Sequence, residues 1–380
     1  MEKRYFDSIG REISLLGFGC MRLPLAQPDQ PEIDLPAAQA LIDLAMAQGV
    51  NYYDTAYMYH EGLSEPFLGQ ALKRYPRESF CLASKMPTWT KLVRDAADVE
   101  KIFAEQLKRC QVDYFDFYLL HSLDAENFAN AEKIGIYQLL KEKQRQGHIR
   151  RLGFSFHDTP EVLTQIVDAH DWDFAQIQLN YLDWKDLESE RLYRILTERH
   201  LPVIIMEPVR GGALATLNES CTAMLQKAAA NRSTASWAIR FAASLPGVMT
   251  VLSGMSDQEQ VADNLNTMSA FQPLTDAEQQ MLIEQVAGAY RSAGEVPCTG
   301  CRYCMDCPVG VNIPKVFLLY NRYKANQKED SFQEDYGGLP VTARAEQCIA
   351  CGQCAAQCPQ KIDIPAQMEH IRQVTAGLGL

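Results

Sequence analysis

Short hydrophobic runs alternate along the chain with longer stretches in which hydrophobic residues recur every three to four positions. The short runs predict strands, and the longer periodic stretches predict amphipathic helices. The expected strands are Leu15–Gly19, Asn51–Asp54, Phe80–Ser84, Phe115–Leu120, Leu152–Ser155, Phe174–Gln178, Val203–Glu207 and Val248–Ser253. Such alternation is typical of an α/β protein with a parallel sheet.

Helices are expected between these strands, and glycines mark the ends of two of them, at Gly49 and Gly147. The predicted helices include Ala37–Gln48, Ala96–Arg109, Ile134–Gln146, Pro160–Ala169, Leu187–Glu198 and Asp257–Met268. Eight strand–helix units fit a closed TIM (β/α)8 barrel over residues 1–294. A doubly wound open sheet is the alternative, but no G-x-G-x-x-G motif follows an early strand to support it.

Composition narrows the class of protein. Of the 380 residues, 47% are hydrophobic and 22% are charged, which is ordinary for a globular protein. The net charge of −12 disfavours nucleic acid and anionic membranes as partners, because both require a concentrated basic face. No run of eighteen apolar residues occurs, and the first residues lack the apolar segment of a signal peptide. We therefore expect a cytoplasmic protein.

Eight of the twelve cysteines crowd the last part of the chain in two groups. They are Cys298, Cys301, Cys304, Cys307, Cys348, Cys351, Cys354 and Cys358. Both groups end in Cys-Pro followed by an Ile-Pro pair, at Cys307–Pro314 and Cys358–Pro365. This internal repeat predicts two similar units in a second domain, residues 295–380. A helix at Pro314–Asn326 and a polar loop around Gly337 are expected between them.

The cysteine spacing points to iron–sulfur clusters. In the second group, two residues separate each of the first three cysteines, a spacing that lets three thiolates cap one face of a [4Fe–4S] cube. The fourth cysteine, which precedes a proline, then reaches another cluster. Two crossed sets are therefore expected: Cys298, Cys301 and Cys304 with Cys358, and Cys348, Cys351 and Cys354 with Cys307. Structural zinc and disulfides are the alternatives, but zinc sites usually pair two separated knuckles and a reducing cytoplasm keeps thiols free.

This segment resembles the dicluster ferredoxin domains, most closely their helical branch. The resemblance implies a mainly α-helical, two-cluster ferredoxin-like domain. The first group is one residue shorter than usual before Cys307, which is its one departure from the pattern.

Four polar residues are expected at the carboxyl ends of neighbouring barrel strands: Asp54, Tyr59, Lys85 and His121. Taken singly, each is more often a capping, packing or hydrogen-bonding residue. Together they can reduce a carbonyl. A tyrosine, with a free pKa of about 10, is a poor acid at neutral pH, and an adjacent lysine is expected to lower that pKa while an aspartate holds the lysine. The histidine would orient the carbonyl, and a nicotinamide would supply hydride.

Residues 5–290 resemble the aldo-keto reductase family. The motifs that carry the resemblance are Gly17-Phe18-Gly19, Asp54-Thr55-Ala56 with Tyr59, Lys85, Leu120-His121, Gly153-Phe154-Ser155, Gln176 with Asn180-Tyr181, and Asp263-Asn264. The resemblance implies that Asp54, Tyr59, Lys85 and His121 form the catalytic tetrad. It also implies that Ser155 and Gln176 hold the nicotinamide carboxamide, and that Asp263 and Asn264 hold the adenine.

The chain departs from this family at the cofactor. Phe156 follows the serine where many members have asparagine, and Met206 stands where an aromatic residue usually stacks on the nicotinamide. The loop 253–260 lacks the lysine and arginine that typically bind the 2′-phosphate of NADP, so NAD is at least as well supported as NADP. Arg210, in a glycine-rich loop, could replace them or simply lie at the surface.

The sequence thus predicts an NAD(P)-dependent aldo-keto reductase-like enzyme for a small-molecule carbonyl substrate, carrying two [4Fe–4S] clusters. A redox partner protein, a ferredoxin or flavoprotein, is expected to exchange electrons with the clusters. Hydride carries two electrons and a cluster one, and no flavin motif is present to couple them. Two alternatives stay open: an electron-transfer protein whose barrel is a docking scaffold, and a plain reductase whose clusters support structure or sense oxidation.

Overall fold

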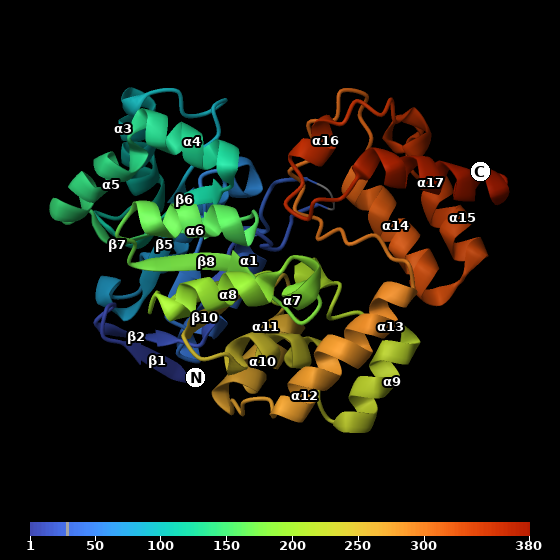
Figure 1. Ribbon diagram of the computed structural model, residues 1–380, viewed down its shortest axis with the longest axis horizontal. Coiled ribbons are helices and arrows are strands. Elements are labelled where there is room, and N and C mark those ends of the chain that lie inside the picture. The colour runs from blue at the N-terminus through green and yellow to red at the C-terminus, as the bar shows by residue number, and fades with distance from the viewer. Residues whose placement is uncertain (28–29) are drawn as a thin grey trace. The chain divides into compact units, whose positions relative to one another are not determined.

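The computed structural model describes residues 1–27 and 30–380, and its first large feature is a closed barrel of parallel strands (Figure 1). In chain order these strands are β3 (Leu16–Gly19), β4 (Tyr52–Asp54), β5 (Cys81–Met86), β6 (Phe115–Leu123), β7 (Ile149–Phe156), β8 (Phe174–Gln178), β9 (Val203–Met206) and β10 (Val248–Ser253). Strand β10 pairs with both β9 and β3 and so closes the ring. The predicted TIM barrel and its eight strands are confirmed, and the open sheet is excluded.

Most barrel strands are buried along their whole length, and hydrophobic residues dominate them because both faces are covered. Every residue of β5, β6, β8 and β10 is buried. Parallel sheets covered in this way carry nearly continuous hydrophobic runs rather than alternating ones. Aromatic residues fill part of the interior, where the Phe117 ring meets Tyr52 and Phe174 at centroid distances of 5.0 and 5.1 Å.

Helices connect the barrel strands. They are α1 (Leu35–Ala47), α2 (Ser64–Leu72), α3 (Ala96–Cys110), α4 (Ala125–Ile134), α5 (Ile136–Arg145), α6 (Pro160–Ala169), α7 (Asp183–Asp186), α8 (Ser189–Glu198), α10 (Thr234–Ser244) and α11 (Gln258–Ser269). Aspartates cap several of them; the Asp95 and Asp257 carboxylates each accept a backbone N–H of the first turn. Gly49 and Gly147 adopt φ of +85° just past helix ends, as predicted.

An antiparallel hairpin, β1 (Lys3–Phe6) and β2 (Arg11–Ser14), precedes the barrel and was not predicted. The chain divides into two compact units. The first unit comprises Met1–Pro208 and Ala238–Thr275, and the second comprises Val209–Trp237 and Asp276–Leu380. The predicted boundary near Glu295 stays a prediction, since the second unit also includes segments before it.

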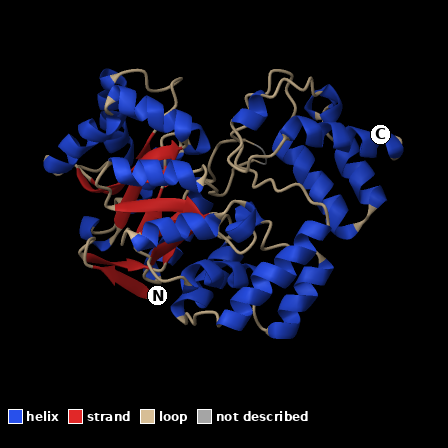
Figure 2. Cartoon of the chain, in the orientation of Figure 1, coloured by secondary structure: helices blue, strands red, loops and turns tan. Residues whose placement is uncertain are grey.

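The second unit is mainly helical in its described residues, as Figure 2 shows. Its helices are α9 (Glu219–Ala228), α12 (Asp276–Gln280), the π-helical η4 (Met281–Val286), α13 (Ala287–Ser292), α14 (Ile313–Asn326), α15 (Glu329–Gly337), α16 (Gln353–Ala356) and α17 (Ile364–Gly377), with short 3-10 turns η5 (Val341–Ala343) and η6 (Ala345–Gln347). The polar loop predicted around Gly337 is partly wrong, because helix α15 runs up to Gly337 and a loop follows only after it.

The internal repeat of the sequence appears in this unit as two similarly started helices. The Asn312 side chain caps α14 by accepting the Lys315 N–H, and the Asp363 side chain caps α17 by accepting the Ala366 N–H. Both helices place proline in the first turn, where no N–H is needed. Phe317 and Ile371 lie in one hydrophobic cluster between them. Among the described residues, no helix is both long and apolar enough to span a bilayer.

Candidate active site and cluster sites

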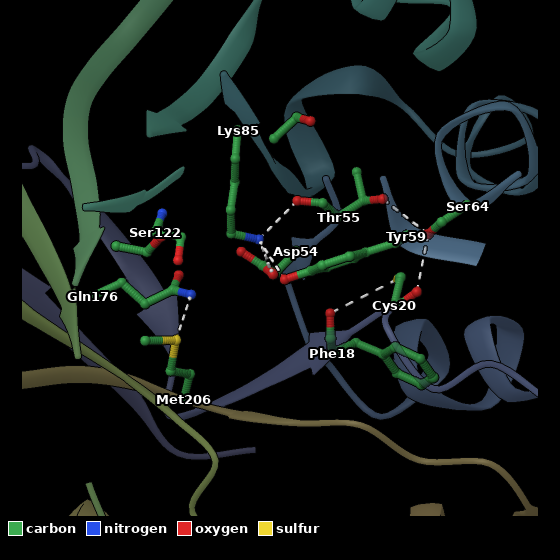
Figure 3. Close-up of polar contacts among 12 residues, drawn as sticks. Phe18, Cys20, Asp54, Thr55, Tyr59, Ser64, Lys85, Ser122, Gln176 and Met206 are labelled. Carbon is green, nitrogen blue, oxygen red and sulfur yellow. Dashed lines mark hydrogen bonds and ion pairs between the residues drawn. The ribbon is translucent and has the colours of Figure 1, made fainter. Parts of the chain in front are cut away.

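The predicted tetrad residues lie at the carboxyl ends of three neighbouring barrel strands. Figure 3 shows three of them, Asp54, Tyr59 and Lys85, pointing toward one another. Asp54 is the last residue of β4, Lys85 lies near the end of β5, and His121 lies in β6. Tyr59 begins the short turn η1 (Tyr59–Gly62), five residues beyond Asp54. This end of a TIM barrel is where active sites form.

Lys85 is the centre of the arrangement. Its Nζ donates to Asp54 Oδ1 at 2.5 Å, to the Thr55 carbonyl at 2.8 Å and to the Tyr59 hydroxyl at 3.3 Å. An ammonium group has three donors, so this fully buried lysine uses all of them. Because the Tyr59 oxygen accepts from Lys85, its own proton is directed to another acceptor.

Burial dominates the electrostatics of these groups. It lowers the pKa of Lys85, an effect that the negative charge of Asp54 opposes, and it raises the pKa of Asp54 against the charge of Lys85. The pKa of Tyr59 is raised well above its usual value by burial and then by Asp54. The expected lowering of the Tyr59 pKa by lysine is therefore not met. The hydroxyl stays protonated at neutral pH.

His121 is buried and faces aromatic rings. Trp89 and Tyr59 approach it edge-on, with ring centroids 5.1 and 5.9 Å away. Its Nδ1 has no hydrogen-bond partner within residues 1–27 and 30–380. Burial, followed by the charge of Lys85, lowers its pKa well below the usual value. The imidazole is therefore neutral at physiological pH and has one N–H to donate.

The neutral state of His121 predicts a pH dependence of stability. Its folded-state pKa lies below the unfolded value, so its contribution is complete above about pH 6.5 and is lost as the pH falls. Replacing His121 with asparagine should remove up to about 1.4 kcal/mol per pH unit from the acid-side fall in the free energy of unfolding. Anaerobic urea unfolding between pH 7 and 5 measures this. The exposed His148 gives a control, His148→Asn; equal slopes for both variants would contradict the prediction.

Ser155 and Gln176 form a second polar group, on β7 and β8. The Ser155 Oγ accepts the Ser122 N–H at 2.7 Å, which leaves the serine proton to donate. The Gln176 side chain donates to the Met206 Sδ at 3.4 Å, and its buried Oε1 has no hydrogen-bond partner in the described chain (Figure 3). A donor beside an unused acceptor matches a primary amide, so these residues fit a nicotinamide carboxamide.

The other predicted cofactor residues are more dispersed. Asp263 and Asn264 lie on α11, and the buried Asn264 amide donates to the Ser253 Oγ at 2.9 Å, tying this helix to the end of β10. Arg210 is buried and belongs to the second unit. None of these positions has its predicted role tested by the structure.

Arg22 is a cation that the sequence analysis did not single out. It pairs with Glu207 at 3.2 Å, and its side chain passes within 3.2 Å of where a Cβ on Gly254 would stand. The loop 253–260 therefore has a neighbouring arginine although it contains none. The only sequence signal was a basic residue directly after the first barrel strand.

The second set of predicted cluster cysteines surrounds one pocket. Its lining includes Cys307, Cys348, Cys351 and Cys354 together with apolar side chains such as Ile313 and Ile364. Burial raises the pKa of the Cys354 thiol, and backbone hydrogen bonds oppose this effect. The charges of Cys348 and Cys307 raise the pKa further, so these two thiols lie near Cys354. Thiols gathered in an apolar pocket become thiolates when they bind a cationic centre, and an iron–sulfur cluster is such a centre.

The first set is grouped around Cys304. Burial raises the pKa of this thiol, and the charges of Cys301, Cys298 and Cys358 raise it further. Cys358 thus lies with the first group although it follows the second group in sequence, as Cys307 lies with the second. This is the grouping that crossed ligand sets require. The cysteines present fit iron–sulfur ligation, and the number of clusters and their individual ligands stay predictions.

Comparison with known proteins agrees with these two parts of the chain. Residues 15–286 match the aldo/keto reductase family, and residues 297–362 match the 4Fe-4S dicluster domain. The chain therefore belongs to the aldo/keto reductase family and carries a C-terminal 4Fe-4S dicluster domain. The family is one of oxidoreductases that take small-molecule carbonyl substrates.

Several relatives match about half to three quarters of the chain. The chain is 25% identical to the uncharacterized oxidoreductase YqkF of Bacillus subtilis, over 73% of this chain and 94% of the relative. It is 24% identical to L-galactose dehydrogenase of Arabidopsis thaliana, over 75% and 95%. A probable aldo-keto reductase 1 of Glycine max is 29% identical over 48% of this chain, and only 52% of that protein is covered.

Solved structures resemble the barrel in the same way. The aldo-keto reductase AKR11C1 from Bacillus halodurans matches with a TM-score of 0.62 and 26% identity, over 75% of this chain and 96% of that one. An aldo-keto reductase from Klebsiella pneumoniae in complex with NADPH matches with a TM-score of 0.59 and 21% identity, over 76% and 96%. At 21% identity, the similarity to the Klebsiella pneumoniae structure shows a shared fold alone.

Proposed function

We propose that this protein is an NAD(P)H-dependent carbonyl reductase that also carries two [4Fe–4S] clusters for single-electron exchange with a partner protein. The observation that carries the reductase proposal is the set of three hydrogen bonds from Lys85 to Asp54, Thr55 and Tyr59. They direct the Tyr59 proton away from the lysine and into the end of the barrel.

Tyr59 acts as the general acid in this proposal. Its hydroxyl is kept protonated by burial, and it donates the proton to the carbonyl oxygen as negative charge develops there. Lys85 stabilises the tyrosinate that results, because its ammonium already lies 3.3 Å from the oxygen. Asp54 holds the lysine, so both charges stay in place during the reaction.

His121 and Trp89 position the substrate. A neutral imidazole can donate one hydrogen bond to the same carbonyl oxygen without competing as an acid. The Trp89 ring contacts the imidazole edge and offers an apolar wall. Ser155 and Gln176 would hold the nicotinamide carboxamide, and a bound reduced nicotinamide supplies hydride.

The dinucleotide preference follows from the cations available. The loop 253–260 carries no lysine or arginine, and Arg22 is already paired with Glu207. Such a site would bind the 2′-phosphate of NADP more weakly than a site with free cations would, so NAD remains a candidate beside NADP. Asp263 and Asn264 are the proposed adenine ligands.

The clusters form a separate redox centre. The proposed sets are Cys298, Cys301, Cys304 and Cys358 for one cluster, and Cys307, Cys348, Cys351 and Cys354 for the other. The three hydrogen bonds of the Lys85 ammonium are all made to residues of the barrel, Asp54, Thr55 and Tyr59. We therefore assign the hydride step to the barrel and one-electron steps to the clusters.

Anaerobic purification tests this function. Iron, sulfide and bound nucleotide should be quantified together, and oxidation of NADH and NADPH should be followed with a panel of aldehydes and ketones. About eight iron atoms per chain and substrate-dependent nucleotide oxidation are expected. Iron without any carbonyl reduction would favour an electron-transfer role, and zinc in place of iron would overturn the cluster assignment.

The unpaired Gln176 Oε1 predicts a specific loss of cofactor affinity. Replacing Gln176 with leucine removes the acceptor for the carboxamide N–H, so the Kd for NAD(P)H should rise about 5- to 150-fold, the effect of a buried hydrogen bond worth about 1–3 kcal/mol. Fluorescence titration measures this Kd, and the melting temperature of the variant checks the fold. An unchanged Kd would remove Gln176 from the cofactor site.

A further inference from the structure

The two cysteine groups belong to an internal repeat, yet matched positions in them have opposite surroundings. Thr299 and Ile349 each follow the first cysteine of their group. The polar Thr299 is 4% exposed, whereas the large apolar Ile349 is 62% exposed. A buried polar residue and an exposed large apolar one are both departures from the usual distribution. Equivalent loops in one domain therefore face different environments.

The loop around Thr299 is covered by another segment of the same unit. A Cβ placed on Gly211 would lie 2.1 Å from the Thr299 carbonyl oxygen, so the two backbones are in direct contact. Residues Arg210–Gly212, the 3-10 turn η3, thus pack on the loop that joins Cys298 to Cys301. The predicted first cluster is enclosed on this side.

The loop around Ile349 is open. Three consecutive residues here are exposed: Ile349, Ala350 and Cys351. All three also line the pocket of the second cysteine set. Cys351 is the one exposed cysteine among the eight. Its counterpart Cys301 is partly buried. A cluster held here would have a ligand sulfur at the protein surface, beneath a small apolar patch.

We propose that the cluster held by Cys307, Cys348, Cys351 and Cys354 is the point at which single electrons enter and leave the protein, and that residues Ile349–Cys351 are the contact surface for a basic one-electron carrier protein. This inference rests on the proposed function, since it requires the clusters. In each transfer one electron passes between this cluster and the carrier's redox centre, with no bond made or broken. The cluster beneath Gly211 is the inner one.

Charge identifies the carrier as basic. From residue 296 to the end of the sequence, eight Lys and Arg residues balance eight Asp and Glu residues. A [4Fe–4S] centre with four thiolate ligands is anionic, so the clusters give this otherwise neutral part of the chain a negative charge. The exposed position of Cys351 brings that charge close to the apolar patch. A carrier with a positive contact surface complements it, and steered association of this kind weakens with ionic strength.

Stopped-flow oxidation of the reduced holoprotein tests the proposal. The probes are ferric cytochrome c, a small basic haem protein, and a small neutral quinone. Replacing Ile349 with lysine should slow oxidation by cytochrome c about tenfold, through lost apolar contact and added repulsion, and leave oxidation by the quinone within about twofold. The control is Leu318→Lys, the same change at an exposed leucine of α14. It should leave both rates unchanged.

A second readout does not depend on turnover. A water-soluble dysprosium chelate should speed the electron-spin relaxation of one reduced cluster more than the other in EPR, because only one has a ligand at the surface. If Ile349→Lys lowers the iron content, Ile349→Ser removes the apolar contact without adding charge. Equal rates for Ile349→Lys and Leu318→Lys, or equal relaxation of both clusters, would overturn the inference. Absence of iron from the wild-type protein would instead contradict the proposed function.

Discussion

Replacing Tyr59 with phenylalanine is expected to lower kcat for NAD(P)H-dependent carbonyl reduction about 10²- to 10⁴-fold, the usual contribution of a positioned general acid. The substitution removes the hydroxyl whose oxygen accepts from Lys85 and which is the proposed proton donor. The ring is retained, and with it the contacts to His121 and to the Lys85 ammonium, whose Nζ lies 4.7 Å from the ring centroid. The loss should therefore fall on the chemical step.

Tyr57 provides a matched control. Its hydroxyl donates to Glu105 Oε2 at 3.1 Å, and its ring lies under the Arg109 guanidinium, so it is tied to the outer helix α3. Tyr57→Phe removes an equivalent hydroxyl two residues from Tyr59 and should leave kcat within about twofold, since surface changes of this kind usually cost little. Steady-state kinetics with the best substrate of the panel, together with nucleotide Kd values, make the comparison. Equal activity of wild-type and Tyr59→Phe protein would exclude the proposed acid.

The barrel could be predicted because its strands are covered on both faces and are therefore rich in hydrophobic residues. The hairpin β1–β2 was not predicted, because its strands are four residues long and alternate between exposed and partly buried positions in β1. Helix α2 contains Pro66 and Gly69, both poor helix formers. Pro66 is tolerated because it stands in the first turn of the helix. Gly69 is required by a tertiary contact, since a Cβ there would lie 2.6 Å from the Cys110 carbonyl.

The positions of the tetrad residues followed from the rule that strand ends meet at one end of a barrel, but their electrostatics did not. Charge proximity alone suggested that Lys85 would lower the pKa of Tyr59. The depth at which Tyr59 lies in the fold reverses the direction, because burial penalises the tyrosinate more strongly. Arg22 was overlooked for a similar reason: only the folded chain brings it to Glu207 and Gly254.

The cysteine pairing was predictable to the level of groups because spacing within a group is short. The different surroundings of the two groups were not. Thr299 and Ile349 occupy equivalent positions in the repeat, and nothing in the local sequence shows that Gly211, nearly ninety residues away, covers one of them. Arg210 and its glycines suggested a phosphate-binding loop. Gly211 instead contacts the loop between Cys298 and Cys301.

Replacing Gly211 with alanine is expected to remove or strongly perturb the first cluster while leaving the second in place. The new methyl group would stand 2.1 Å from the Thr299 carbonyl oxygen, far inside van der Waals contact. Neither can rotate away, because the methyl carbon is fixed to the Cα and the oxygen belongs to the backbone. The loop carrying Cys298 and Cys301 must move, and a thiolate displaced from the cube face no longer binds iron. Iron should fall from about eight to about four atoms per chain.

Gly212→Ala is the matched control for this prediction. Gly212 has φ of +101° and Gly211 has φ of +64°, so alanine is conformationally strained at both positions. A Cβ at Gly212, however, meets no atom of the described chain within 4 Å. If backbone strain were the cause of cluster loss, Gly212→Ala would lose at least as much iron as Gly211→Ala.

Iron and sulfide analysis of both variants, with EPR of the dithionite-reduced proteins, separates these cases. The second cluster serves as an internal standard, because its pocket is lined by residues from Cys307 onward and includes none of residues 209–212. One remaining EPR signal in Gly211→Ala and two in Gly212→Ala would support contact-driven loss. Full iron in Gly211→Ala would show that the first cysteine loop tolerates displacement and does not depend on η3.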